Sequence, residues 1–130
     1  MTVLASACCY GLRCRWHGRR AGKSRALRDL EARGVTIIPA CPEMLGGLPC
    51  PREPVRTIRG RVYATDAQTR SRQGEELTAA FHRGAEACLD LARRHGIADA
   101  YLFRLSPSCA PGGITGKLLQ AGGITVHPIW

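Results

Sequence analysis

A helix followed by a buried strand can be read from residues 24–40, SRALRDLEARGVTIIPA. Ser24 is a suitable N-cap, the alanines and leucines after it recur at helical spacing, and Gly34 provides a C-terminal cap. Residues 35–39 are short and rich in β-branched side chains, which is typical of a buried strand. An apolar run at 3–7, VLASA, supplies an earlier strand. Strand, helix and strand in this order predict a right-handed parallel crossover.

The rest of the chain continues the alternation of strands and helices. The other expected elements are a polar loop at 9–22, a proline-rich loop at 41–54, a hairpin of 55–58 and 61–65, helices at 73–95 and 114–120, and strands at 98–105 and 124–129. This pattern predicts an α/β fold, a single-domain three-layer sandwich over residues 1–130. Its sheet is expected to have four strands, mostly parallel and in the order 2-1-3-4, plus the small β-hairpin.

Composition narrows the class of protein. The chain has 130 residues, enough for one domain with a buried core. The formal charge of +9 comes mainly from arginine, which reflects either a basic surface for anionic partners or an arginine-rich codon usage. No stretch approaches the roughly 20 apolar residues of a membrane span, and the first residues do not resemble a signal peptide. Seven cysteines, an odd number, favour metal or thiol chemistry in the cytoplasm over a disulfide framework.

Three of the seven cysteines stand just beyond the apolar runs. Cys8 follows the first strand, Cys41 follows the second, and Cys109 follows the third after a short turn. The carboxyl ends of parallel strands meet at one edge of the sheet, where open α/β folds place their sites. We expect Cys8 and Cys109 to flank the crevice there, with Cys41 beside Cys8. Such thiolates suit an iron–sulfur cluster, zinc or copper(I), although small thiols also simply pack in cores.

Three further residues have alternative roles, and a fourth, a cysteine, is expected only to pack. Cys14 could be a fourth ligand, a reactive thiol or a structural residue, and the arginines that flank it are predicted to lower its pKa. Cys88 lies on the apolar stripe of the long helix and is expected in the core. Glu43 is either a general acid or base beside Cys41 or a solvated loop residue. Ser106 either donates a hydrogen bond into the crevice or stabilises a turn.

Several blocks of the sequence together resemble a known family. The blocks are Ser6-Ala7-Cys8 with GLRCRWHG at 11–18, CPEMLGGLP at 41–49 with PREP at 51–54, FHRGAE at 81–86, and SPSC at 106–109. They occur in the family's order and cover nearly the whole chain. The family was long catalogued as a domain of unknown function and includes the bacterial thiouracil desulfidases.

The resemblance implies a cofactor and a reaction. It implies a 4Fe-4S cluster held by Cys8, Cys41 and Cys109, with one iron left without a protein ligand. That iron would take the sulfur of a thiocarbonyl, and water would replace the sulfur at the carbon without net redox change. Glu43 matches the family's acidic residue and would move protons, and Ser106 matches the serine of the last block and would hydrogen-bond the substrate. The implied protein is an enzyme, an iron–sulfur-dependent desulfidase that converts the C=S group of a thiouracil-like pyrimidine into C=O.

The partners are less closely defined. The implied substrate is a small thiolated base or nucleoside, the basic composition leaves tRNA open, no membrane partner is expected, and the sequence indicates no oligomeric state. A function from another class is a non-catalytic zinc or cluster-binding module that docks on RNA. Ala110 stands where the family usually has glycine, in a shortened loop, and His17 stands where an aspartate is common. These departures concern the substrate more than the cluster.

Overall fold

The computed structural model describes residues 1–19, 22–65 and 73–130. The elements in chain order are β1 (Thr2–Ser6), the 3-10 helix η1 (Ala7–Tyr10), α1 (Arg25–Ala32), β2 (Thr36–Ala40), α2 (Pro42–Leu45), β3 (Val55–Ile58), β4 (Arg61–Thr65), β5 (Gln73–Glu76), α3 (Thr78–Arg94), β6 (Asp99–Phe103), α4 (Ile114–Ala121) and β7 (Thr125–Ile129). Among the helices of the described residues, none is long and apolar enough to cross a membrane.

Four strands form one parallel sheet in the order β2-β1-β6-β7. The central strand β1 pairs with β2 up to Ser6 opposite Ala40, and with β6 at Leu4 opposite Ala100. This order confirms the predicted arrangement 2-1-3-4 of the main strands, and all of its pairings are parallel. After β1, the chain adds β2 on one side of it and later β6 on its other side. The strand order therefore switches between β1 and β6, and their carboxyl ends border the crevice that such folds use for ligands.

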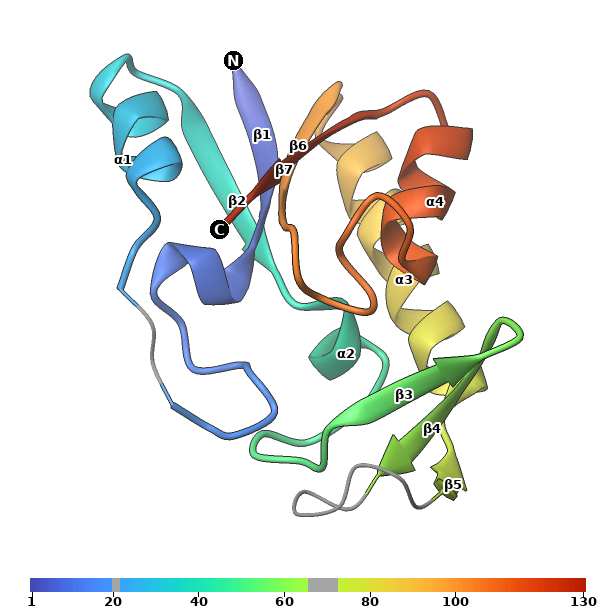
Figure 1. Ribbon diagram of the computed structural model, residues 1–130. Coiled ribbons are helices and arrows are strands. Elements are labelled where there is room, and N and C mark those ends of the chain that lie inside the picture. The colour runs from blue at the N-terminus through green and yellow to red at the C-terminus, as the bar shows by residue number, and fades with distance from the viewer. Residues whose placement is uncertain (20–21, 66–72) are drawn as a thin grey trace.

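Helices cover both faces of this sheet, which confirms the predicted three layers. Leu4 and Leu102 belong to a core that includes side chains of α3 and α4. Their strand neighbours Ala5 and Phe103 point to the opposite face, where they pack with Leu27 of α1 and with η1. Figure 1 shows α1 on one side of the sheet and the paired helices α3 and α4 on the other. The period-2 alternation of strand side chains therefore fills two separate cores.

The predicted hairpin is part of a larger sheet. Strands β3, β4 and β5 form a three-stranded antiparallel sheet that lies below the carboxyl ends of the parallel strands (Figure 1). The prediction of a helix from residue 73 was wrong, because residues 73–76 pair with β4 and α3 begins at Thr78. Long-range contacts hold this strand: Glu76 pairs with Arg61 at 2.6 Å, and Thr78 Oγ1 accepts a hydrogen bond from Val62 N.

Both predicted loops begin with a short helix. The polar loop at 9–22 starts within η1, and its residues 20 and 21 lie outside the described part of the chain. The loop at 41–54 contains α2, in which Pro42 occupies the first turn and Cys41 the N-cap position. Proline suits the start of a helix because it has no backbone N–H to leave unpaired there. Cys8 and Cys41 are thus each placed by a helix that starts where a strand ends.

Helix α2 packs against α3 through two glycines. A Cβ on Gly84 would lie 1.8 Å from the carbonyl oxygen of Pro42, and a Cβ on Gly46 would lie 2.0 Å from that of Ala80. Neither position has room for a side chain, so the two backbones approach as closely as glycine allows. The position of α2, and of the site residues that it carries, therefore depends on this contact.

We expect Gly84→Ala to lower the free energy of unfolding by about 1–3 kcal/mol, the range for overpacked interiors, because its methyl group would push α2 away from α3. Urea unfolding followed by circular dichroism measures the change. Gly22→Ala is the matched control, since its Cβ would meet nothing within 4 Å. Equal unfolding midpoints for the two variants would contradict the tight contact.

Candidate active site

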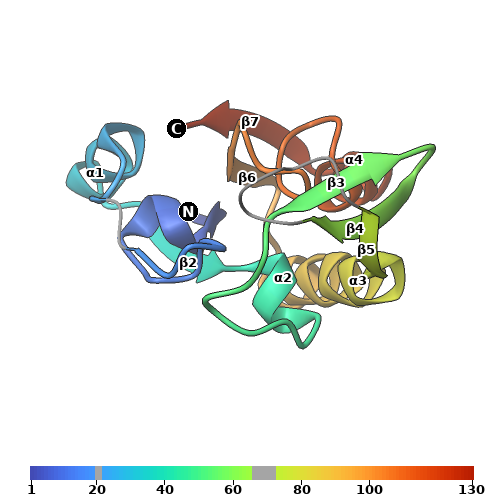
Figure 2. The same ribbon diagram turned by 60° about the horizontal axis from the view of Figure 1, so that its bottom comes forward.

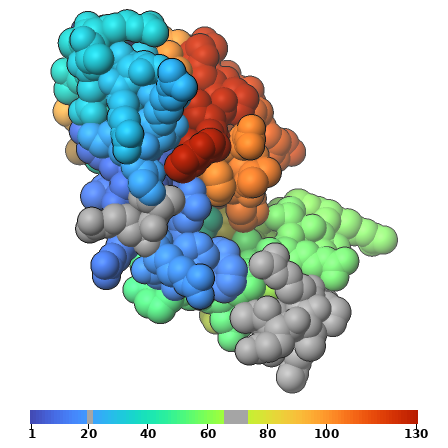
Figure 3. Space-filling view, turned by 60° about the vertical axis from the view of Figure 1, so that its left-hand side comes forward, coloured from blue at the N-terminus to red at the C-terminus, as the bar shows by residue number. Residues whose placement is uncertain are grey.

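A cavity of about 750 Å³ opens at the carboxyl edge of the parallel sheet. Its volume lies in the range of small-molecule sites, about 300–1,000 Å³. Cys8 of η1, Cys41 after β2 and Cys109 after β6 all line it, so the structure brings the three predicted thiols to one place. Figure 2 looks toward this edge, with α2 in front, and Figure 3 shows where the N-terminal segment, the segment after β6 and the antiparallel sheet meet at the surface.

The thiol of Cys14 lies within the same group of sulfurs. It is 4% exposed and within hydrogen-bonding reach of Cys41 and Cys8. Hydrogen bonds from Cys14 are the largest cause that lowers the pKa of Cys41 and of Cys8, so both favour the thiolate. The pKa of Cys14 itself is raised, by the hydrogen bonds to Cys41 and Cys8 and then by burial. The prediction that flanking arginines lower it was wrong, because Cys14 keeps its proton between two thiolates, and the nearby arginine Arg15 acts on Cys8 instead.

Ser106 fixes the turn that carries Cys109. Its Oγ accepts hydrogen bonds from the backbone N–H groups of Ser108, at 3.1 Å, and of Cys109, at 3.0 Å. The Cys109 thiol is buried, and burial raises its pKa. A hydroxyl has two acceptor positions and one donor, so Ser106 can still donate its own proton toward the cavity that it lines. Ser106 therefore stabilises the turn, as one of its two predicted roles requires, and its hydroxyl proton stays available for the second role, donation of a hydrogen bond into the crevice.

Glu43 is buried against an arginine instead of facing solvent. The residue is 9% exposed, and its carboxyl group pairs with Arg52, whose Nε donates to Oε2 at 2.6 Å and whose Nη2 also contacts Oε2. Burial raises the pKa of Glu43, and the charge of Arg52 opposes this shift. A carboxyl group with a raised pKa beside a cavity is suited to proton transfer. The interpretation of Glu43 as a solvated loop residue was therefore wrong.

Arg52 connects the loops that form one wall of the cavity. Its Nη2 donates to the carbonyl oxygen of Cys14 at 2.8 Å, and its Nη1 donates to that of Pro49 at 3.1 Å. Its backbone N–H donates to the carbonyl of Trp16 at 2.6 Å. Arg52 thus orients Glu43 and holds the 14–16 segment beside it. In the sequence, Arg52 stands out only as part of the PREP block at 51–54. The one feature that could have indicated its role is that this arginine shares the proline-rich loop with Glu43.

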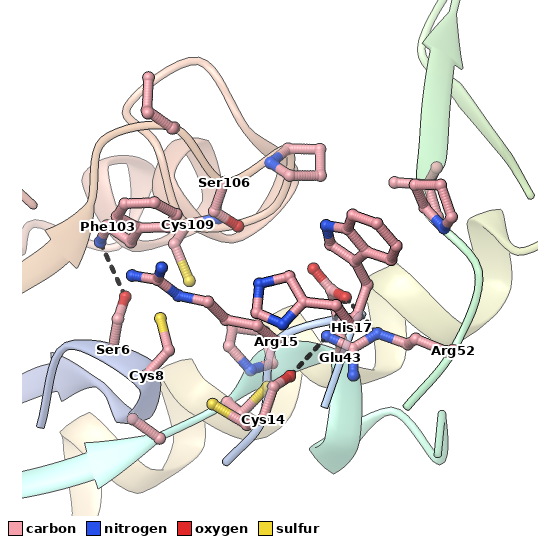
Figure 4. A pocket seen from close by; sticks show the side chains of 18 of the residues that line it. Ser6, Cys8, Cys14, Arg15, His17, Glu43, Arg52, Phe103, Ser106 and Cys109 are labelled. Carbon is pink, nitrogen blue, oxygen red and sulfur yellow. Dashed lines mark hydrogen bonds and ion pairs between the residues drawn. The ribbon is translucent and has the colours of Figure 1, made fainter. Parts of the chain in front are cut away.

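Arg15 is a second residue whose role sequence reasoning missed. Its guanidinium carbon lies 4.4 Å from the centroid of the Phe103 ring, and it lines the cavity. Figure 4 shows its side chain reaching across the pocket toward Cys8 and Ser6. Its charge is one of the causes that lower the pKa of Cys8, after the hydrogen bonds from Cys14 and Cys9.

The cysteines outside the cavity pack elsewhere. Cys88 of α3 is 1% exposed in the core between the sheet and α3, as predicted. Cys9 is fully buried on the opposite face of the sheet. The Cys50 thiol donates to the carbonyl oxygen of Arg15 at 3.2 Å. Position just beyond a strand end thus identified Cys8, Cys41 and Cys109 as cavity residues, and it did not identify Cys14, which also lines the cavity.

The donor set of the cavity fits an iron–sulfur cluster. Within the three described ranges, no three His, Cys, Asp or Glu side chains converge on one point that could hold a metal ion. One tetrahedral zinc needs sulfurs within about 2.3 Å of a common centre. Cys8, Cys41 and Cys109 line one cavity, and cysteine thiolates are the usual ligands of iron–sulfur clusters. Soft thiolates are the donor set that iron–sulfur clusters take.

A sequence model of the 2-thiouracil desulfurase family matches residues 3–127. The chain belongs to the 2-thiouracil desulfurase family. The solved structure of TudS, a [4Fe-4S]-dependent thiouracil desulfidase, is similar with a TM-score of 0.83 and 34% identity, over 98% of this chain and 89% of that one. YbbK of Bacillus subtilis (strain 168), an uncharacterized protein, is 31% identical over 95% of this chain and 85% of its own.

These matches confirm the predicted fold class and family resemblance. The 2-thiouracil desulfurase family also favours the enzyme over the non-catalytic RNA-binding module. Within this family member, Cys8, Cys41, Cys109, Glu43 and Ser106 come from separate segments of the chain and line the same cavity.

Proposed function

We propose that this chain is an iron–sulfur-dependent desulfidase that converts the C=S group of a thiolated pyrimidine base or nucleoside into C=O. The observation that carries the proposal is the cavity lined by Cys8, Cys41 and Cys109 together with a buried carboxyl group, in a chain of the 2-thiouracil desulfurase family. Thiocarbonyl and water give carbonyl and hydrogen sulfide. The C=S bond is replaced by C=O, both protons of water leave with the sulfur, and no electrons are transferred.

Cys8, Cys41 and Cys109 would hold a 4Fe-4S cluster in which one iron has no protein ligand. Such a cluster would supply a Lewis acid that binds and polarises the thiocarbonyl sulfur. Low pKa values support Cys8 and Cys41 as thiolate ligands. Burial disfavours a charged Cys109, and a bound metal would compensate that charge. Cys14 is not a ligand in this proposal, because its raised pKa favours the protonated thiol.

Glu43 would move the protons of the reaction. Its carboxylate accepts a proton from the attacking water and returns it to the departing sulfur. The raised pKa supports this role, because it makes the carboxylate a stronger base than an exposed glutamate. Arg52 orients the carboxylate through its contacts to Oε2, so the free oxygen can face the cavity.

Ser106 would position the substrate through its hydroxyl proton. We expect Ser106→Ala to raise KM about 3–10-fold, the equivalent of one neutral hydrogen bond. Ser108→Ala is the matched control, because the Ser108 hydroxyl is buried and bonded to Thr115 at 2.7 Å. The control should lower thermal stability and leave KM unchanged. An unchanged KM in Ser106→Ala would restrict Ser106 to its turn.

Anaerobic purification and a parallel substrate assay test the function. We expect a brown protein with broad absorbance near about 400 nm, as thiolate-ligated iron–sulfur centres show. Sulfide release from thiouracil, thiouridine and thiolated tRNA should then be compared, with release from the free base or nucleoside expected. A colourless protein with one zinc after anaerobic reconstitution would overturn the iron–sulfur cofactor. Sulfide release from tRNA alone would overturn the base or nucleoside substrate. We also infer a cytoplasmic location, where a reducing environment keeps such thiols free.

A further inference from the structure

Arg15 places two buried N–H donors of its guanidinium group where the described residues offer them no acceptor. Its Nε and Nη2 atoms are buried, and no hydrogen-bond partner for either lies within the part of the chain that the structure describes. A buried donor that is left without an acceptor is destabilising, more so when the donor belongs to a charged group. Such a group is stable in a fold when an anion from outside the chain binds against it. Arg15 therefore indicates the place of an anionic occupant of the cavity.

Contacts of the side chain and of the backbone of Arg15 fix the position of its guanidinium group in the cavity. The ring of Phe103 packs against it at 4.4 Å. The carbonyl oxygen of Arg15 accepts hydrogen bonds from Gly18 N at 2.9 Å and from Cys50 Sγ at 3.2 Å. Arg52 binds the carbonyls of the residues on both sides of Arg15. Because its backbone and its ring neighbour are fixed, the side chain stays directed into the cavity.

The carboxylates of the cavity do not neutralise Arg15. Glu43 is engaged by Arg52, and Glu53 is exposed on the rim. The group beside the guanidinium is instead a sulfur, that of Cys8, with Cys109 drawn on the same side of the pocket (Figure 4). The anion that this surrounding fits is therefore sulfur-based: a thiolate ligand together with the sulfides of a cluster.

We propose that Arg15 is a positioning residue whose guanidinium donates N–H···S hydrogen bonds to anionic sulfur at the Cys8 end of the cluster. The inference rests on the proposed function, because it takes the cluster as the occupant. Hydrogen bonds to the sulfurs and a nearby positive charge raise the reduction potential of an iron–sulfur cluster. A higher potential protects the cluster from oxidation and the loss of iron that follows it. Arg15 would thus keep the cluster intact beside an open cavity.

Three variants test this role against the reconstituted wild type. Arg15→Met keeps the length and the apolar contact with Phe103 and removes the charge and the donors. At a fixed potential we expect its ratio of reduced to oxidised cluster to fall about tenfold, which is 59 mV for one electron. Iron should pass to a chelator at least about tenfold faster, in line with the cost of losing an outer partner of a metal site. Arg15→Lys should be intermediate, because lysine keeps the charge and loses the planar fork.

Thermal unfolding gives a readout that a merely structural residue would not produce. Without the cluster, Arg15→Met should be at least as stable as the wild type, because it removes two buried donors that have no acceptor among the described residues. With the cluster, the order should reverse. Arg13→Met is the matched control, since Arg13 is exposed in the same loop and its loss should change neither property.

The outcomes separate the two proposals. A potential and an iron-release rate in Arg15→Met equal to those of the iron-loaded wild type would overturn the role of Arg15 alone. A cluster-free Arg15→Met variant that is less stable than the cluster-free wild type, or that fails to fold, would also overturn the role of Arg15. A wild type that binds no iron under the same conditions would overturn the proposed function together with this inference.

Discussion

Replacing Cys41 with serine is expected to abolish cluster binding. Cys41 lies at the N-cap position of α2 and lines the cavity, and its low pKa favours the thiolate that iron requires. Loss of one of three ligands should lower iron affinity by more than roughly 100-fold, the upper range for residues that only support a ligand. Iron and sulfide analysis after anaerobic reconstitution measures the loss. Cys8→Ser and Cys109→Ser should behave in the same way.

Two other cysteines provide the controls for this experiment. Cys88→Ser changes a thiol in the core outside the cavity and should keep the iron. Cys14→Ser is the sharper control, because Cys14 is within hydrogen-bonding reach of Cys41 and Cys8 and yet is proposed to keep its proton. It should retain the cluster. Iron loss in both Cys14→Ser and Cys41→Ser would show that the assignment of three ligands is wrong.

The second large effect is expected from Glu43→Gln. Glutamine keeps the size of the side chain and a carbonyl oxygen for Arg52, and it cannot accept a proton. We expect kcat to fall about 10²–10⁴-fold, the usual contribution of general acid–base catalysis, while the iron content stays at the wild-type level. Glu53→Gln, in an exposed residue on the rim of the same cavity, is the matched control and should leave kcat unchanged.

The pH dependence provides an independent check of Glu43. To accept a proton from water, the carboxyl group must first be ionised. Since burial raises its pKa, kcat should rise with pH through a limb that lies above the ordinary range of glutamate. Glu43→Gln should lack this limb. A wild-type limb at the pKa of an exposed glutamate, or the same limb in the variant, would exclude Glu43 as the group that titrates.

Local patterns in the sequence were enough to predict the parallel sheet. The short β-branched run at 35–39 and the apolar run at 3–7 became β2 and β1, because buried strands and amphipathic helices have periods that neighbouring residues reveal. Strand β5 was missed, because residues 73–76 (QGEE) show no alternation of apolar side chains and stand directly before the apolar period of α3, so only their pairing with β4 makes them a strand. Long-range pairing of this kind leaves no trace in a local period.

The residues of the site also fall into those that local sequence identifies and those whose roles depend on long-range contacts. Cys8, Cys41 and Cys109 could be found because their distance from a strand end is local information. The role of Arg52 depends on its hydrogen bond to Cys14, 38 residues away, and that of Arg15 on which ring packs against it. No motif states which loops will pack together, so these contacts could come only from the fold.

The glycine contact between α2 and α3 also limits how the substrate range of this protein could be altered. A scan of substitutions should identify Gly84 and Gly46 as intolerant positions, although neither has a side chain and neither lines the cavity. Engineering for bulkier substrates would have no freedom on that side, because the spacing between the two helices is set by their backbones. The adaptable side is the opposite rim, where Arg104 and Leu105 are exposed and can be exchanged without moving α2.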